Sequence, residues 1–124
     1  MEVIAEAQVF AEVTDLGTQH LEEFIAQMFG PVLESYSKRI TTGAYAPRDK
    51  KPGFVASLAC KDMKHALSIA ESRLTRLPTL ETAFKRLNFA RNFAGESLDS
   101  SAVYGAARRE AGLSFWNENS RTDN

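Results

Sequence analysis

A chain of 124 residues is long enough for one domain with a modest core. Its 44% apolar and 25% charged residues are typical of a soluble globular protein, and a net charge of −1 excludes a general attraction to nucleic acid or to an anionic membrane. No apolar run is long enough to span a bilayer, and the single cysteine, Cys60, excludes an internal disulfide framework, so we expect the cytoplasm or another reducing compartment.

Six stretches of the chain repeat apolar side chains at helical spacing. The expected helices cover residues 1–16, 19–29, 32–41, 53–77, 78–95 and 101–111. Gly17 is suited to end the first helix, and Pro31 and Pro78 suit the first turns of the helices at which they stand. No stretch alternates with a period of two for long enough to form a strand. The sequence therefore predicts an all-α bundle of about six helices over residues 1–113, followed by a polar, disordered tail over residues 114–124.

The first helix has no capping residue ahead of it, because the apolar pattern is already under way at Met1. We therefore expect Met1 to be an internal methionine of a longer protein, and a targeting signal is then not observable. The stretch itself carries Glu2, Glu6 and Glu12 and no basic region, which is not typical of a signal peptide. At the other end of the chain, Asp99 or Ser100 is suited to cap the last helix.

The helix expected over residues 53–77 is predicted to be the most central element. One of its sides repeats residues that we expect to face the core: Met63, Leu67, Ala70 and Leu74. Another side combines an aromatic ring with charge: Phe54, Leu58, Lys61 and His65. Lys61 and Asp62 lie about 100° apart around the helix axis, so that each is able to flank one side of a groove. The alternative is a solvated charge pair on an ordinary amphipathic helix.

Motifs for most site chemistries are missing from this sequence. It contains neither a G-x-G-x-x-G segment nor a Walker segment, so no nucleotide-binding fingerprint is present. His20 and His65 have no partners at metal-ligand spacing, so we predict no metal site. Cys60 next to Lys61 is better explained as a small buried residue than as an activated thiol.

An ordered set of short motifs resembles the β-hydroxyacid dehydrogenases, a family that includes 3-hydroxyisobutyrate dehydrogenase and glyoxylate reductase and is related to 6-phosphogluconate dehydrogenase. The main segment is Phe54-x6-Lys61-Asp62-Met63-x2-Ala66-Leu67-x2-Ala70. The resemblance continues at Ala5-Glu6-Ala7, Leu77-Pro78, Thr82-Ala83 and Leu98-Asp99-x-Ser101-Ala102-Val103. It covers most of residues 1–113.

The resemblance implies the fold of that family's C-terminal domain, which is all-helical and follows a Rossmann domain. This chain resembles the helical domain alone, since the family's catalytic lysine motif and its glycine-rich cofactor loop are absent. We therefore assign no catalytic residue and expect the isolated chain to bind no cofactor and to be inactive. In the parent enzyme, which would use NAD or NADP, the resemblance implies that Lys61 contacts the cofactor. It also implies that Phe54 and Asp62 border the substrate cleft.

The resemblance further implies a small-molecule substrate in the parent, either a 3-hydroxy acid or an aldehyde acid. Family members pair through the helical domain, so we expect a homodimer, including exchange of helices between chains, with no nucleic acid and no membrane as partner. The first helix, with Val3, Ile4 and Phe10, is the expected contributor. The alternative function is a non-catalytic helical module for dimerisation or protein interaction, on which the charged residues are only solvated surface.

Overall fold

The computed structural model describes residues 1–123, which form five α-helices and one short 3-10 helix. Their bounds are α1 Glu2–Val13, α2 Thr18–Thr41, α3 Ala56–Ser72, α4 Pro78–Ala94, η1 Ser100–Ala102 and α5 Val103–Glu110. Across these residues there is no strand, only an isolated antiparallel bridge between Val55 and Asp99. The prediction of an all-α fold is confirmed. No helix in this part of the chain combines the length and the apolar character needed to cross a membrane.

The predicted count of six helices is not confirmed, because α2 covers both helices expected over 19–29 and 32–41. The backbone bends sharply inside α2 at Gly30, where φ is 80° and ψ is −173°. Glycine adopts this conformation without steric cost, and Pro31 then restarts helical geometry with its fixed φ. Gly30 and Pro31, which in the sequence separate two expected helices, therefore stand at the bend within α2.

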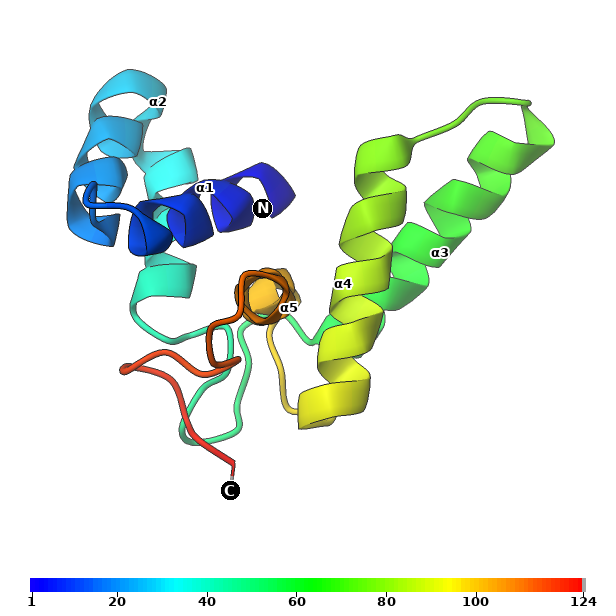
Figure 1. The fold of residues 1–124 in the computed structure, drawn as a ribbon. Coiled ribbons are helices and arrows are strands. Elements are labelled where there is room, and N and C mark those ends of the chain that lie inside the picture. Colours follow the sequence, from blue (N-terminus) through cyan, green and yellow to red (C-terminus); the bar gives the residue numbers. More distant parts are fainter. Residues whose placement is uncertain (124) are drawn as a thin grey trace.

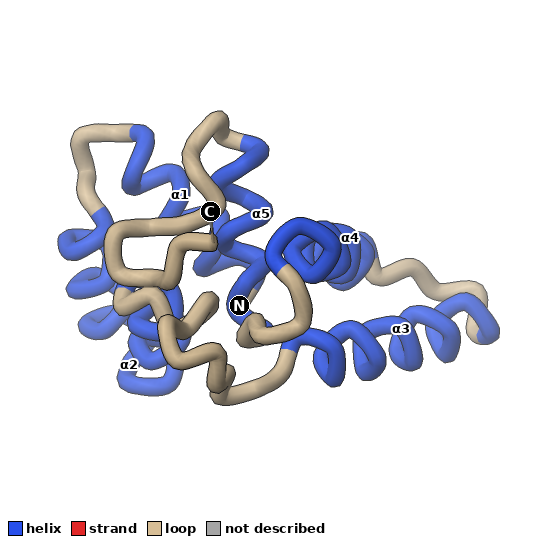
Figure 2. The backbone as a smooth tube through the Cα atoms, turned by 90° about the horizontal axis from the view of Figure 1, so that it is seen from below, coloured by secondary structure: helices blue, strands red, loops and turns tan. Residues whose placement is uncertain are grey.

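Helix α5 lies between two pairs of helices (Figure 1). On one side α1 packs against α2, and on the other side α3 and α4 form an antiparallel hairpin. Both α1 and α4 also contact α5, which joins the two pairs. Figure 2, seen from below, shows the α3–α4 hairpin extending away from the rest of the molecule. The core therefore surrounds α5, and the far end of the hairpin projects from it.

The central position of α5 follows from its small side chains. Residues Val103 to Arg108 are all buried, and three of them are glycine or alanine. At Gly105 a Cβ atom would lie 2.5 Å from Cε2 of Phe115, so the aromatic ring packs directly on the helix backbone. Only glycine permits so close an approach, which explains its presence inside a helix where it otherwise destabilises.

The prediction that the helix over residues 53–77 is the most central element is wrong. The corresponding helix, α3, packs mainly against α4 and η1 and lies at the edge of the fold. Of its expected core residues only Ala70 is buried, whereas Met63 and Leu67 are half-buried. Leu74 lies beyond the end of the helix, with φ at 52° and 98% of its surface exposed. The apolar side exists, but the protein covers only part of it. Cys60 is buried as predicted.

The tail also differs from its prediction, because residues 114–123 pack against the body of the protein instead of being disordered. Phe115 is 1% exposed, and its main-chain oxygen accepts a hydrogen bond from the Tyr45 hydroxyl at 2.8 Å. Arg121 is buried and donates to the carbonyls of Ala94 (2.8 Å) and Ser97 (2.7 Å). The guanidinium thus satisfies a carbonyl at the C-terminal end of α4. Asn124 lies outside the described residues.

Arg86 of α4 ties the hairpin to α1 and α5. Its guanidinium pairs with Glu2, with Glu6 at 2.6 Å and with Glu110 at 2.6 Å. Burial raises the pKa of Glu2, whereas the hydrogen bond from Arg86 lowers the pKa of Glu110. A single arginine therefore holds three carboxylates from two different helices.

Candidate functional site

The chain is held firmly just before α3 begins. The Phe54 N–H donates to Oδ2 of Asp99 at 2.8 Å, and the Phe54 carbonyl accepts from the Ser100 N–H at 2.8 Å. The Ala56 N–H donates to the Leu98 carbonyl at 2.8 Å. Residues 54–56 thus lie antiparallel to residues 98–100. The helix expected from residue 53 therefore starts at Ala56, and Phe54 lies outside the helix that carries Lys61.

The three residues singled out from the sequence lie at the surface near this point. Phe54 is 41% exposed, and Lys61 and Asp62 are exposed on the first half of α3. Neither the Lys61 ammonium nor the Asp62 carboxylate forms an ion pair or side-chain hydrogen bond with any residue in 1–123. Both charges therefore face solvent and are available to a ligand or to another domain. The roles of these three residues in binding remain predictions.

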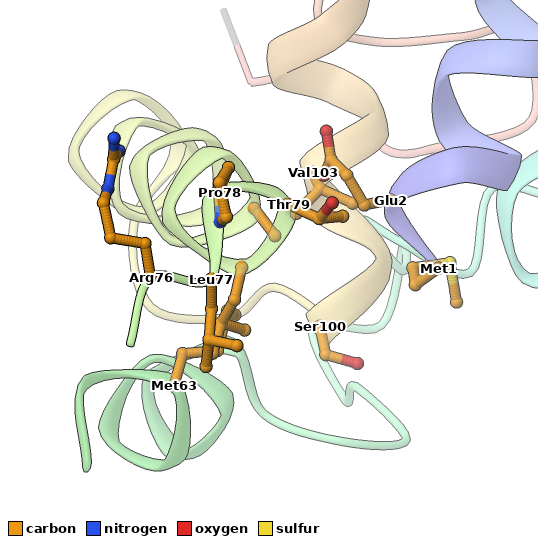
Figure 3. A pocket seen from close by; sticks show the side chains of 11 residues that line it. Met1, Glu2, Met63, Arg76, Leu77, Pro78, Thr79, Ser100 and Val103 are labelled. Atoms are coloured by element: carbon orange, nitrogen blue, oxygen red, sulfur yellow. The ribbon is translucent and has the colours of Figure 1, made fainter. Parts of the chain in front are cut away.

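A groove of about 570 Å³ lies next to this segment, between α3, the start of α4, the start of α1 and η1. Figure 3 shows Met63 and Leu77 at one end of the groove and Met1 at the other. It is lined by Met1, Glu2, Met63, Arg76, Leu77, Pro78, Thr79, Leu80, Ala83, Ser100 and Val103. The walls are largely apolar, which suits the exclusion of water from a bound group.

Ser100 connects the groove to the predicted site, because it lines the groove and its N–H holds the Phe54 carbonyl. Met63 provides a second connection, since it follows Lys61 and Asp62 on α3. Phe54, Lys61 and Asp62 do not themselves line the groove. The structure thus brings Phe54 close to η1, but it does not gather the three predicted residues around one cavity.

Sequence reasoning identified Asp99 only as a possible helix cap, and the structure gives it more contacts. Asp99 does cap η1, since Oδ1 accepts from the Ser101 N–H at 2.9 Å. Its other oxygen, Oδ2, also pairs with Arg39 Nη2 at 2.8 Å. Arg39 stands on α2, 60 residues away, and no local pattern marks such a pair. Two sequence signals therefore pointed to Asp99, its cap chemistry and the resemblance motif Leu98-Asp99-x-Ser101, and neither pointed to Arg39.

A second, polar cavity of about 650 Å³ lies between α1, α2, α5 and the tail. Its main charged groups bind one another: Glu12 pairs with Arg108 and accepts a hydrogen bond from the Tyr104 hydroxyl. Glu22 accepts from the hydroxyls of Ser37 (2.6 Å) and Thr41 (2.8 Å). We interpret this cavity as structural, because its strongest polar groups are already paired. Residues 1–123 contain no group of three metal-ligating side chains close enough to hold an ion.

No protein-family model matches this chain. A curated relative is the NADH-dependent oxidoreductase ucdB of Aspergillus ustus, which is 29% identical over 116 residues. The aligned region covers 93% of this chain and 40% of the relative, so the chain spans less than half the length of that protein. The similarity therefore relates nearly the whole of this helical chain to one part of an oxidoreductase.

Proposed function

We propose that this chain forms the helical side of the cofactor and substrate cleft in an NAD(P)-dependent oxidoreductase that acts on a small 3-hydroxy acid or aldehyde acid. The observation that carries the proposal is the start of α3. There, Phe54 is held by both of its main-chain groups, while Lys61 and Asp62 are exposed without protein partners. Similarity to part of an NADH-dependent oxidoreductase supports the same reading.

Each of the three residues suits a distinct task in such a cleft. The Lys61 ammonium is a compact cation able to donate to a ribose hydroxyl or to an anionic substrate group. The Asp62 carboxylate is next in sequence and is able to orient donors near that cation. The Phe54 ring excludes water from one wall. The nicotinamide, when bound, would supply the hydride chemistry, and the protein residues would orient it and keep the site dry.

The chain supplies one side of the cleft, so we propose that it does not turn over substrate alone. Its 124 residues contain no glycine-rich turn for a pyrophosphate and no lysine in the family's catalytic motif. Hydride transfer requires the cofactor and the substrate in near-attack geometry, which one wall does not provide. The reading frame ahead of Met1 is the first test, because the proposal requires it to encode a G-x-G-x-x-G turn and a lysine motif.

The activity test uses that longer protein and follows NAD(P)H absorbance with glyoxylate, succinic semialdehyde or tartronate semialdehyde. Lys61→Ala should raise the Michaelis constant for the cofactor by an amount equivalent to about 1–3 kcal/mol, because a charge-assisted bond is lost. Lys64→Ala is the matched control, since it removes the same charge from another exposed position on α3. Equal effects of the two substitutions, or no effect of either, would make Lys61 an ordinary surface charge.

We also propose that the chain forms a homodimer through α1 and α2. An apolar groove of about 420 Å³ lies between these helices, and the rings of Phe24 and Phe29 pack edge to face at its side. Phe24 is nevertheless 52% exposed, and Phe29 is 60% exposed. Light scattering should give a dimer that Phe24→Ser weakens. Phe89→Ser, at a comparably exposed ring on α4, should leave it intact. A monomer at high concentration would contradict this assembly.

A further inference from the structure

Asp99 lies where four segments of the chain meet, and it is 1% exposed. Its Oδ2 accepts from Arg39 Nη2 and from the Phe54 N–H, each at 2.8 Å. Its Oδ1 accepts from Ser101 twice, from the N–H at 2.9 Å and from the hydroxyl at 2.6 Å. The Asp99 N–H donates to the Tyr45 carbonyl at 3.0 Å. One buried residue thus connects α2, the loop at Tyr45, the segment before α3, and η1.

A carboxylate is costly to bury unless it is paired and its oxygens accept hydrogen bonds. Asp99 meets both conditions, because each oxygen has two donors and one of these donors is a guanidinium. Bonds from a main-chain N–H to a charged acceptor are stronger than those to a neutral one. The bond from the Phe54 N–H to Asp99 is therefore stronger than the same bond to a neutral acceptor would be.

The position of the Phe54 ring depends on these main-chain bonds. With 41% of the residue exposed, packing covers only part of Phe54. The N–H and the carbonyl of Phe54 are instead fixed by Asp99 and Ser100, and the next residues lead directly into α3 at Ala56. Movement at Asp99 would therefore move the ring and the first turn of α3 together.

We propose that Asp99 is a positioning residue, which sets where Phe54 and the start of α3 face the cleft. Its value for an enzyme rests on the proposed function. The positioning itself is a property of the chain as it stands, and it does not depend on activity. Arg39 supports this positioning, because its guanidinium forms an ion pair with the carboxylate that accepts from the Phe54 N–H.

The test measures amide hydrogen exchange in the 124-residue chain by NMR. Asp99→Ala removes both carboxylate oxygens, so the Phe54 N–H and Arg39 lose their acceptor. Asp99→Asn is not suitable, because its amide oxygen is able to occupy the Oδ2 position and keep the Phe54 bond. We expect the Phe54 amide to exchange about tenfold faster or more, relative to the Ala102 amide. The Ala102 N–H donates to the main-chain carbonyl of Asp99 at 2.9 Å, which the substitution keeps.

The ratio of the two exchange rates separates positioning from general stability. A substitution that merely loosens the fold would speed both amides by the same factor, and that result would overturn the proposal, as would an unchanged Phe54 rate. Ser101→Ala is the matched control, because it removes only the hydroxyl that faces Oδ1, and it should leave the Phe54 rate within about twofold.

If Asp99→Ala does not fold, the unmodified chain still decides. The Phe54 amide should exchange at least about tenfold more slowly than the Gly53 amide, which has no hydrogen-bond partner among residues 1–123. Equal rates for these two amides would overturn the proposal. Loss of Phe54 protection in Asp99→Ala, together with a Lys61→Ala enzyme of unchanged cofactor affinity, would keep the positioning role and reject the proposed function.

Discussion

Helix α5 and the outer part of the α3–α4 hairpin are both amphipathic in sequence, but they differ in how the fold covers them. Around α5 every residue from Val103 to Arg108 is buried, between α1, α4 and the ring of Phe115. In the hairpin Ile69 is 57% exposed and Leu74 is 98% exposed. The comparison shows that an apolar pattern identifies a side of a helix, whereas burial depends on whether another element reaches that side.

The difference also separates two kinds of surface residue. On α5 the buried Arg108 is paired with Glu12 of α1. On α3 the charges of Lys61 and Asp62 have no partners in residues 1–123. A region whose polar groups are paired is suited to hold a fold together, and a region with free charges beside a half-covered apolar side is suited to meet something else. The proposed cleft lies in the second region.

The largest expected effect tests the covered region. Leu87 of α4 is 0% exposed, so Leu87→Ala should reduce the free energy of unfolding by about 2–5 kcal/mol through lost burial and a residual cavity. Urea denaturation followed by circular dichroism measures this change. Leu67→Ala on half-buried α3 is the comparison, and its cost should be clearly smaller. Equal costs would mean that α3 is covered as fully as the core.

An intermediate effect tests the contact between α5 and α4. Glu110 pairs with Arg86 but its side chain is 57% exposed, so Glu110→Gln should destabilise by only about 0.5 kcal/mol at pH 7. The pKa of Glu110 is lowered from its ordinary 4.5 by the hydrogen bond from Arg86. Its contribution is therefore fully present above pH 4.5 and is lost as the pH falls through the lowered pKa.

Unfolding of the Glu110→Gln variant at a series of pH values from 7 to about 2 measures this dependence. The difference from the unmodified chain should shrink toward zero at the acid end. Glu2, on the same arginine, has a raised pKa, so its own contribution is present below pH 4.5 and is lost as the pH rises through that pKa. Glu110 is one of the charges that raise the pKa of Glu2, so the comparison of variant with unmodified chain also contains a change from Glu2, of opposite sign.

The smallest expected effect is at the tip of the hairpin. Leu74 is 98% exposed, so Leu74→Ser should change the free energy of unfolding of the isolated chain by less than about 0.5 kcal/mol. Thermal or urea denaturation at several protein concentrations measures it. A larger loss that grows with protein concentration would show that a second copy of the chain covers the tip. The tip would then be buried in the assembly, as α5 is buried within one chain.

Local sequence features were sufficient for the class of fold and for most of the points at which the chain turns. Helical spacing with glycine at Gly17 and Gly112 and proline at Pro31 and Pro78 indicated an all-α protein, because these residues act through their own backbone preferences. Even the merged helix α2 has its bend at Gly30, where the sequence predicted a boundary. The motif Leu98-Asp99-x-Ser101 contains two residues that bind each other, since the Asp99 carboxylate accepts from the N–H and the hydroxyl of Ser101.

What surrounds each helix could not be predicted in the same way. The burial of the tail depends on Tyr45 and Arg121 meeting partners far away in sequence, and polar composition alone indicated disorder. The central position of α5 depends on the ring of Phe115 packing against the backbone at Gly105. The position of Phe54 depends on Asp99 and, through it, on Arg39 of α2.

The sequence by itself therefore determined the helical class, the turns and the residues available for a site, because propensity, capping and periodicity are properties of neighbouring residues. Only the tertiary structure decided that α5 and not α3 is central, that the tail is packed, and that Phe54 is held from η1. Each of these outcomes is a contact between residues distant in the chain, whose energy depends on what else is present at that point in space.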